Sequence, residues 1–141
     1  MSWVKTHTIT VKDIKPHQIW QVWSDVNNWH LWDTDIEFAH LDGGFEKGSI
    51  FSLKPKGGPK VAIEIIDAIP NKSFTDCTKF PLAKMYGTHQ MQEGTDGLTL
   101  TVSVKVTGLL GYLWRKLVAE KVAQGIPEQT QKLLELAATK K

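Results

Sequence analysis

The spacing of hydrophobic positions changes once along this chain. Up to residue 106, apolar residues recur mainly at every second position, apart from a helical interruption within about 16–32. From 108 to 138 they recur three or four positions apart, as at Leu110, Leu113, Trp114, Leu117, Val118 and Val122. That spacing is typical of an amphipathic helix with one buried face. The sequence therefore predicts one helix of about 40 Å, from Tyr112 to Ala138, lying across one sheet.

The two-residue alternation predicts seven strands. The last strand is the clearest, because Leu and Val alternate there with Thr, Ser and Lys, so that one face meets a core and the other meets water. Short turns such as Gly94-Thr95-Asp96-Gly97 indicate antiparallel neighbours. The strands are expected at 3–12, 36–41, 49–54, 61–67, 72–79, 84–93 and 98–106.

Two short helices are expected between the first and second strands. Pro16 suits the first position of a helix, and Asn27 is expected to cap a second helix that ends at Trp32. The order of elements predicts a single α+β domain over residues 1–141, in which a curved antiparallel sheet is covered by the C-terminal helix.

Composition excludes several classes of protein. The chain is 41% hydrophobic and 23% charged, which is ordinary for a soluble globular protein. A net charge of +2 argues neither for nor against a nucleic-acid surface, and no dense Lys/Arg block is present; no nucleic-acid partner is expected. The single cysteine, Cys77, cannot form an internal disulfide, so we expect a reducing, cytoplasmic location. There is no apolar stretch for a signal peptide or a membrane span, and stable membrane insertion is not expected.

A cavity between the helix and the sheet is suggested by two features. Pro127 removes a helical N–H and predicts a kink, and Gly125 beside it has no side chain to fill the groove. The strand faces also mix apolar and polar residues, as with His89 between two methionines, which is typical of a small-molecule site. Methionine and aromatic residues at strand spacing are also common in an ordinary core, and this alternative stays open.

The tryptophan pattern points to a family. Trp20-x-x-x-Ser24-Asp25 followed by Trp29-x-x-Trp32-Asp33 resembles the polyketide cyclase/dehydrase-like branch of the START/SRPBCC superfamily. Gly108-Leu109-Leu110-Gly111 and the helix with Gly125-Ile126-Pro127 are similar to the same branch. The resemblance implies the helix-grip fold, in which a seven-stranded sheet grips the C-terminal helix around an apolar cavity. It implies a small hydrophobic ligand that is lipid- or polyketide-like, and no general cofactor.

His89 is the candidate catalytic residue, because a neutral histidine in an apolar pocket can act as a general acid or base or can hydrogen-bond a ligand oxygen. A structural or solvent-facing histidine is the ordinary alternative, and it stays open. Tyr86 lies on the opposite face of the same strand, so only one of the two can line the pocket. No metal ligand set is expected. The expected ligand-binding residues share an inward position or a place on the helix: Trp32, Phe38, Phe51, Phe74, Met85, His89, Met91, Trp114, Val118 and Val122.

Other groups are weaker candidates. Asp76 and Glu64 would be a pair of catalytic carboxylates, with solvated side chains as the ordinary alternative. The loop at 54–60 has three lysines that suit an anionic group, or simply a solvated hairpin end.

Three functional hypotheses remain open from the sequence. The first is a carrier or binding protein for a small hydrophobic molecule. The second is a cyclase or dehydratase acting on an aromatic polyketide-like substrate, with His89 moving protons. The third is a protein-interaction module, like the chaperone-activating members of the superfamily, with a large exposed apolar patch. A homodimer is compatible with all three.

Overall fold

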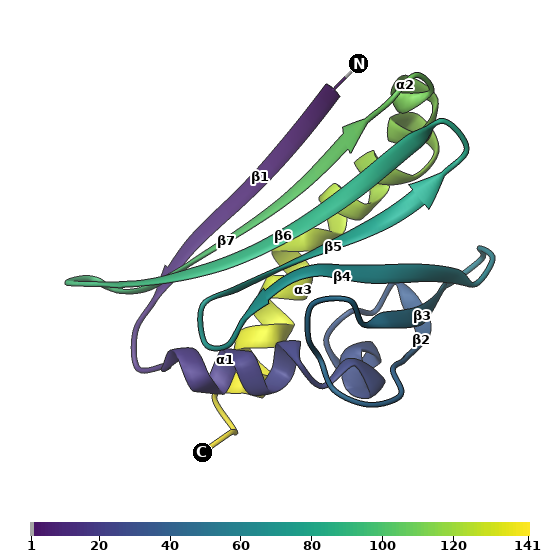
Figure 1. Cartoon of the computed structure of the whole chain (residues 1–141). Coiled ribbons are helices and arrows are strands. Elements are labelled where there is room, and N and C mark those ends of the chain that lie inside the picture. The colour runs from purple at the N-terminus through teal and green to yellow at the C-terminus, as the bar shows by residue number, and fades with distance from the viewer. Residues whose placement is uncertain (1) are drawn as a thin grey trace.

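Seven strands, four helical segments and a short 3₁₀ turn make up the part of the chain that the computed structural model describes, residues 2–141 (Figure 1). The first elements are β1 (Ser2–Val11), α1 (Pro16–Trp23) and the 3₁₀ turn η1 (Val26–Leu31). The strands β2 (Ile36–His40), β3 (Ile50–Pro55), β4 (Val61–Ile69), β5 (Ser73–Phe80), β6 (Ala83–Gly94) and β7 (Gly97–Thr107) follow. The chain ends with α2 (Gly111–Trp114), the π-helical segment η2 (Arg115–Ala119) and α3 (Glu120–Ala137).

The strands form one antiparallel sheet in the order β1-β7-β6-β5-β4-β3-β2. Figure 1 shows α3 lying diagonally behind this curved sheet, with α1 and η1 at the lower end. The predicted α+β architecture is confirmed: seven antiparallel strands, two short helical elements between the first and second strands, and a long C-terminal helix. Within residues 2–141, no helix is both long and apolar enough to cross a membrane.

The inner face of the sheet is the one that meets the C-terminal helix. Along β7, buried residues on this face alternate with more exposed residues on the outer face. The buried residues of β7 face the helix and pair across the sheet with inward residues of β1 and β6. Val102, for example, lies opposite His7 on β1 and opposite His89 on β6. The same register continues to Phe74 on β5. The pairing register therefore places side chains from distant segments next to one another on the inner face.

The groove between the sheet and the helices contains two separate apolar clusters. We call the larger one the aromatic cluster; it joins α1, η1, β2–β5 and the end of α3 through side chains that include Trp23, Trp29, Phe51, Phe74 and Leu133. We call the smaller one the aliphatic cluster; its buried members are Val102, Val104, Val106, Ala119 and Ile126. Met85 and Val122 are partly buried and pack against the aliphatic cluster.

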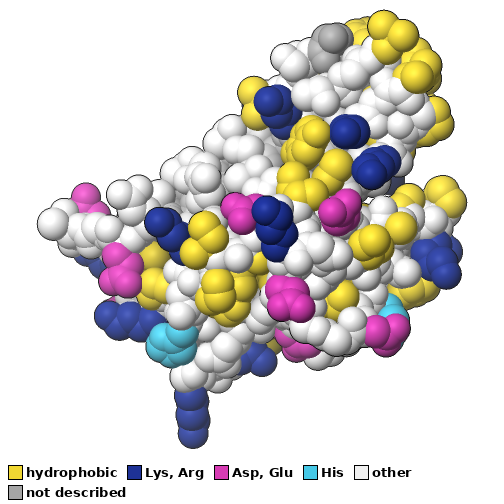
Figure 2. All heavy atoms as spheres, viewed as in Figure 1, with side chains coloured by type: hydrophobic (Ala, Val, Ile, Leu, Met, Phe, Trp, Pro, Cys, Tyr) yellow, Lys and Arg dark blue, Asp and Glu magenta, His cyan; other side chains and the backbone are white. Residues whose placement is uncertain are grey.

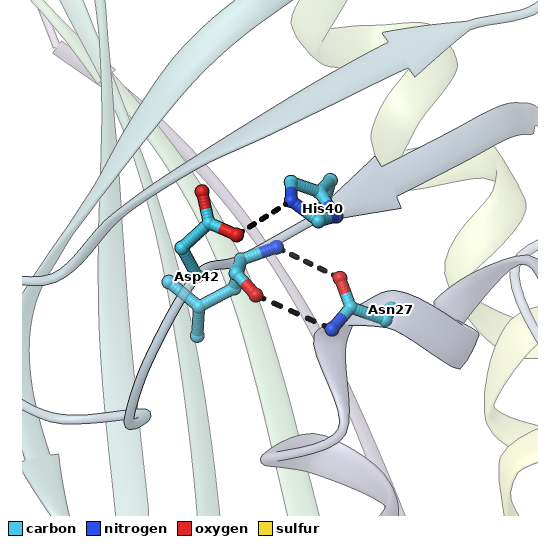
Figure 3. Close-up of polar contacts among 4 residues, drawn as sticks. Asn27, His40 and Asp42 are labelled. Carbon is cyan, nitrogen blue, oxygen red and sulfur yellow. Dashed lines mark hydrogen bonds and ion pairs between the residues drawn. The ribbon is translucent and has the colours of Figure 1, made fainter.

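The first helix begins as predicted, and the second does not. In α1, Pro16 is the first residue, and the Lys15 N–H donates to Gln18 Oε1 at 2.7 Å. Asn27 lies inside η1 and does not cap it, so that prediction is wrong. Its amide instead clamps the end of β2: Nδ2 donates to the Leu41 carbonyl at 3.2 Å, and the Leu41 N–H donates to Oδ1 at 2.8 Å (Figure 3).

The long helix is irregular near its start. The π-helical segment η2 places residues five apart on one face, and Arg115 Nε donates to Glu120 Oε2 at 2.9 Å. The Arg115 guanidinium also lies 5.2 Å from the centre of the Trp3 ring. Pro127, where a kink was predicted, lies inside α3 and lacks the N–H that would donate to the Ala123 carbonyl, but the helix continues through it without interruption.

Gly125 was expected to leave the groove unfilled, and this expectation is wrong. A Cβ at this position would lie 2.6 Å from Asp35 Oδ2, so the glycine lets the loop before β2 approach the helix closely. Gln129 Nε2 donates to Asp33 Oδ1 at 3.1 Å in the same contact. Burial, together with the nearby charge of Asp35, raises the pKa of Asp33 to about 6, although Lys56 and a backbone hydrogen bond act in the opposite direction.

Candidate functional site

Polar side chains lie on the inner face of the sheet where its two apolar clusters meet. They are Asp76 and Thr78 on β5 and His89 on β6. Asp76 is paired with Gly87, and Thr78 is paired with Met85, so all of them share the face of the buried β7 residues. Most inward positions in this fold are apolar, and this polar group therefore marks the best candidate site.

His89 is held between aromatic rings. Its ring stacks on Phe74 with centroids 4.1 Å apart and planes inclined by 7°, and it meets the edge of Trp23 at 5.7 Å. Burial lowers the pKa of His89 to about 3, so the imidazole is neutral at pH 7. Its Nδ1 atom is buried and has no hydrogen-bond partner within residues 2–141. The inward position resolves the choice between His89 and Tyr86, since Tyr86 points to the outer face.

Asp76 lies over a glycine of the neighbouring strand. The Gly87 N–H donates to Asp76 Oδ1 at 3.2 Å, and a Cβ on Gly87 would lie only 2.8 Å from the same oxygen. Burial raises the pKa of Asp76 to about 7, while the hydrogen bond from Gly87 lowers it. Near neutral pH the carboxyl group is therefore partly protonated and can either donate or accept a hydrogen bond.

Thr78 adds a second polar atom without a partner. The residue is 3% exposed, and its Oγ1 has no hydrogen-bond partner among the described residues. The indole nitrogens of Trp23 and Trp32 are likewise buried and unpaired within residues 2–141. Buried polar atoms are normally hydrogen-bonded, so Thr78 Oγ1 and His89 Nδ1 suit a ligand or water molecules as partners.

The pairing of β5 with β6 determines how Asp76 and His89 lie relative to each other. Asp76 and His89 are diagonal neighbours across β5 and β6, a relation that places residues about 7–8 Å apart. No hydrogen bond joins Asp76 to His89 Nδ1 in the described chain, and both side chains can contact one small molecule. At pH 7 the group offers a neutral imidazole and a carboxyl that is close to its pKa. It can thus hold an uncharged oxygen-containing molecule without burying a full charge.

Most predicted ligand-binding residues lie in the groove, in two different settings. The side chains of Trp32, Phe51, Phe74 and Met91 are buried in the aromatic cluster. Met85 and Val122 lie against the aliphatic cluster, and Val118 is half-buried on η2. The partly buried apolar residues of this set, Met85, Val118 and Val122, are thus those on the side of the aliphatic cluster.

Trp114 lies at one end of the groove. Its ring stacks on Phe80 with centroids 4.5 Å apart, and its Nε1 donates to the Pro81 carbonyl at 3.0 Å. These contacts fasten the beginning of the C-terminal helix to the turn between β5 and β6. Trp114 therefore covers the end of the groove at the turn between β5 and β6.

Phe38 is the predicted site residue that the structure places elsewhere. The pairing of β2 with β3 shifts between Ile36 and Phe38, so Ile36 is buried while Phe38 and His40 point outward. Phe38 is 39% exposed, and the inward residue next to it is Ala39. The prediction was wrong because it assumed an unbroken alternation, which a bulge interrupts.

The weaker candidates do not form sites together. Glu64 pairs with Cys77 on the outer face, so the proposed carboxylate pair with Asp76 is wrong. His40 Nε2 lies 2.9 Å from Asp42 Oδ1 in an exposed contact, as Figure 3 shows. In residues 2–141, no three His, Cys, Asp or Glu side chains are grouped as metal ligands would be. The sequence shows only that Asp76 and Thr78 share one strand face with Phe74. It gives no sign of which polar atoms lack hydrogen-bond partners.

Two surface hollows lie outside the groove. One, of about 460 Å³, lies at the turn between β5 and β6 on the side of Lys79 and Tyr86. The other, of about 110 Å³, lies between α1, η1 and the C-terminus and is lined by Val22, Asp25, Asn28, Leu31, Leu136 and Lys140. Neither is lined by Asp76, Thr78 or His89.

Comparison with known proteins gives consistent findings. The family described as polyketide cyclase/dehydrase and lipid transport matches residues 3–139. Among solved structures, protein MLL2253 from Mesorhizobium loti aligns with a TM-score of 0.69 and 16% identity over 96% of each chain. The hypothetical protein jhp0584 from Helicobacter pylori aligns with a TM-score of 0.76 and 11% identity, over 96% of this chain and 88% of that one.

A further structural neighbour is the di-domain ARO/CYC protein StfQ from the steffimycin biosynthetic pathway. It aligns with a TM-score of 0.78 and 10% identity over 97% of this chain and 51% of StfQ, so this chain spans about half of its length. At such identities the similarity shows the fold alone. No curated protein matches this sequence.

Proposed function

Because the chain belongs to the polyketide cyclase/dehydrase and lipid transport family, we propose that it binds a small, mostly apolar molecule with at least one oxygen atom in the groove between the sheet and the C-terminal helix. The match over residues 3–139 confirms the resemblance inferred from the tryptophan motif. The observation that supports the binding site best is the group of inward polar residues Asp76, Thr78 and His89, in which Thr78 Oγ1 and His89 Nδ1 are buried and unpaired among the described residues.

The ligand would lie toward the aliphatic cluster. The aromatic side chains on the other side of His89 are closely packed, and Phe74 and Trp23 are fully buried. Met85, Val118 and Val122 are only partly buried, and Met is an adaptable side chain. We therefore infer that the apolar part of the ligand displaces these side chains, while its oxygen contacts Asp76, Thr78 or His89.

Native mass spectrometry tests the proposal. The protein is purified without detergent, its mass is measured under native conditions, and any bound molecule is extracted after denaturation. We expect an additional mass that is lost on denaturation and an extracted molecule that is apolar and contains oxygen. If the native mass equals the chain alone, and the uncharged probe N-phenyl-1-naphthylamine also does not bind, the proposal is wrong.

Thr78→Val is the matched variant for the polar contact, because it removes the unpaired hydroxyl and keeps the volume of the side chain nearly unchanged. We expect it to weaken binding of the extracted molecule without unfolding the protein. The control is Ser52→Val on β3, where the hydroxyl lies outside the polar group. Equal effects of the two variants would contradict a ligand at Thr78.

An enzymatic role is the second candidate, and it is favoured by the titration of Asp76. A carboxyl with a pKa of about 7 beside a neutral imidazole can take up or release a proton during cyclisation or dehydration. The test uses an aromatic polyketide-like substrate with wild type, Asp76→Asn and His89→Gln. Retained binding with lost turnover in either variant supports catalysis, whereas no turnover by the wild type leaves binding as the function.

A further inference from the structure

The end of the molecule that contains α2 has an unusual apolar surface. The strand register brings residues 2–6, 77–86 and 103–107 together at this end, and the chain continues there as 108–121; we call these four segments the α2 end. Figure 2 shows hydrophobic side chains gathered at its tip. The exposed members around α2 are Leu82 (63%), Leu109 (83%), Tyr112 (60%), Leu113 (45%) and Leu117 (61%), and Val4 (58%) on β1 is also exposed at this end.

The exposed side chains around α2 form one patch. The Leu110 N–H donates to the Leu82 carbonyl at 2.9 Å, which brings the turn between β5 and β6 against the start of the C-terminal helix. Leu109 lies in the turn just before α2, Leu113 lies in α2, and Leu117 lies in η2, so exposed leucines follow one another through the start of the C-terminal helix. Exposed apolar side chains grouped in this way mark an interaction surface, whereas single ones are ordinary.

Positive charge is concentrated at the same end. The α2 end contains seven of the 17 Lys and Arg residues and one of the 15 acidic residues, Glu120. Its formal charge is therefore +6, while the rest of the chain has −4. The cations are Lys5, Lys79, Lys84, Lys105, Arg115, Lys116 and Lys121.

Five of these seven cations form no salt bridge within residues 2–141, and the acidic residues Asp76 and Glu64 lie at the border of the α2 end. Glu120 pairs with Arg115 at 2.9 Å and with Lys116 at 3.1 Å. Lys79, Lys84 and Lys105 form no salt bridge with any residue of the described chain. Lys79 and Lys84 also line the 460 Å³ hollow together with Leu82 and Tyr86, so that cationic and apolar groups meet there.

We propose that the α2 end docks on a membrane surface that contains anionic lipids. The exposed leucines would enter the boundary between headgroups and acyl chains, and the lysines would lie against the headgroups, which is the arrangement of surface-bound amphipathic segments. Tyr112 suits the same boundary, because its ring is apolar and its hydroxyl is polar. This inference does not depend on the ligand proposed above.

A second copy of this chain is a poorer fit to the same surface. In a two-fold dimer the patch would meet itself, so the unpaired lysines of one copy would face those of the other. Like charges that meet at an interface are unfavourable, whereas an anionic surface complements them. The distribution of charge therefore favours a lipid surface.

Vesicle flotation tests the proposal. Wild-type protein is mixed with vesicles of phosphatidylcholine alone or with about a third phosphatidylserine, at low and high salt. We expect flotation with the anionic vesicles only, and weaker flotation at high salt. The double substitution Lys79→Glu with Lys84→Glu should lower the partition coefficient by about tenfold or more, and Leu109→Asp with Leu113→Asp should abolish binding.

The matched control is Leu31→Asp, since Leu31 is 55% exposed in η1, outside the α2 end. It should float like the wild type, and circular dichroism should show that every variant is folded. The proposal is overturned if the wild type does not bind anionic vesicles or if Leu31→Asp weakens binding as much as the two α2-end variants. It is also overturned if the wild type is a dimer that Leu109→Asp makes monomeric while leaving flotation unchanged.

Discussion

The two apolar clusters fill the two ends of one groove in different ways. In the aromatic cluster, rings meet edge to face, as where Trp23 contacts Phe74 at 5.2 Å and Trp29 contacts Phe51 at 5.1 Å. The aliphatic cluster has smaller buried side chains, and the helix above it contains the π-helical segment η2. One end of the groove is therefore closely packed, while the other is covered by small and partly buried side chains.

This difference assigns separate roles to the two ends. Large buried aromatic groups give most of the apolar stabilisation, and they fix the position of His89 by stacking. The end near the aliphatic cluster has less to lose when its side chains rearrange. Asp76 and Thr78 lie between the two, so a ligand held there would be anchored on rigid strands and covered by the more adaptable end.

The largest predicted effect compares two tryptophans. Trp23 is fully buried in the aromatic cluster, and Trp23→Ala should lower the free energy of unfolding by about 3–5 kcal/mol. Trp114 is partly buried at the α2 end, and Trp114→Ala should cost about 1–2 kcal/mol through the lost stacking on Phe80 and the lost hydrogen bond to Pro81. Urea denaturation measures both values.

Trp20→Ala is the control for tryptophan removal as such, because Trp20 is only partly buried beside the aromatic cluster. Its cost should lie between the other two. A loss for Trp114→Ala as large as that for Trp23→Ala would mean that the two ends are equally well packed, and the comparison would then be wrong.

The second effect concerns the pH dependence of stability. A carboxyl whose pKa rises from 3.8 to about 7 on folding favours the folded state fully below pH 3.8, and this contribution is lost as the pH rises toward 7. Between pH 5 and 8 the wild type should therefore lose on the order of 1–2 kcal/mol relative to Asp76→Asn, with solvent screening at this partly buried site taken into account.

The measurement is urea denaturation of both proteins at several pH values. The pKa of Asp33 is also raised, but Asp33 is present in both proteins, so its effect cancels in the difference. His89 has the opposite sign: its pKa is lowered from 6.5 to about 3, so its contribution is lost as the pH falls through that range. A difference between wild type and Asp76→Asn that does not change with pH would contradict a raised pKa at Asp76.

The smallest effect compares two polar contacts near β2. Asn27→Ala removes both hydrogen bonds to the Leu41 backbone and should lower the free energy of unfolding by about 1–2 kcal/mol. His40→Ala removes the exposed contact with Asp42 and should change it by less than about 0.5 kcal/mol. Thermal or urea denaturation measures both, and equal losses would show that the clamp by Asn27 has no special role.

The sequence predicted the elements well because their signals are local. The alternation along β7 and the proline at the start of α1 depend on neighbouring residues, and both predictions are confirmed. The membership of Phe74, Asp76 and Thr78 on one strand face also follows from parity alone. The alternation of side chains does not show which face of the sheet the helix covers. The sequence therefore could not decide whether Tyr86 or His89 faces the helix.

The errors arise from contacts between distant segments. The bulge in β2 turned Phe38 outward, and the alternation of the sequence gives no sign of it. Gly125 was interpreted as an unfilled position, whereas it makes room for Asp35, which lies far away in the sequence. The stacking of His89 on Phe74 and its contact with Trp23 likewise depend on the register of β5 and β6 and on the position of α1.

Methionine methyl NMR tests the central claim, that a ligand lies in the groove toward the aliphatic cluster. The chain has three methionines: Met85 packs against the aliphatic cluster, Met91 is buried in the aromatic cluster, and Met1 lies outside the described residues. The protein is labelled with ¹³C at the methionine methyl groups and titrated with the uncharged probe N-phenyl-1-naphthylamine. A large, saturable shift of Met85 with little change at Met91 is the predicted result. Saturable binding that leaves Met85 unchanged would contradict the account.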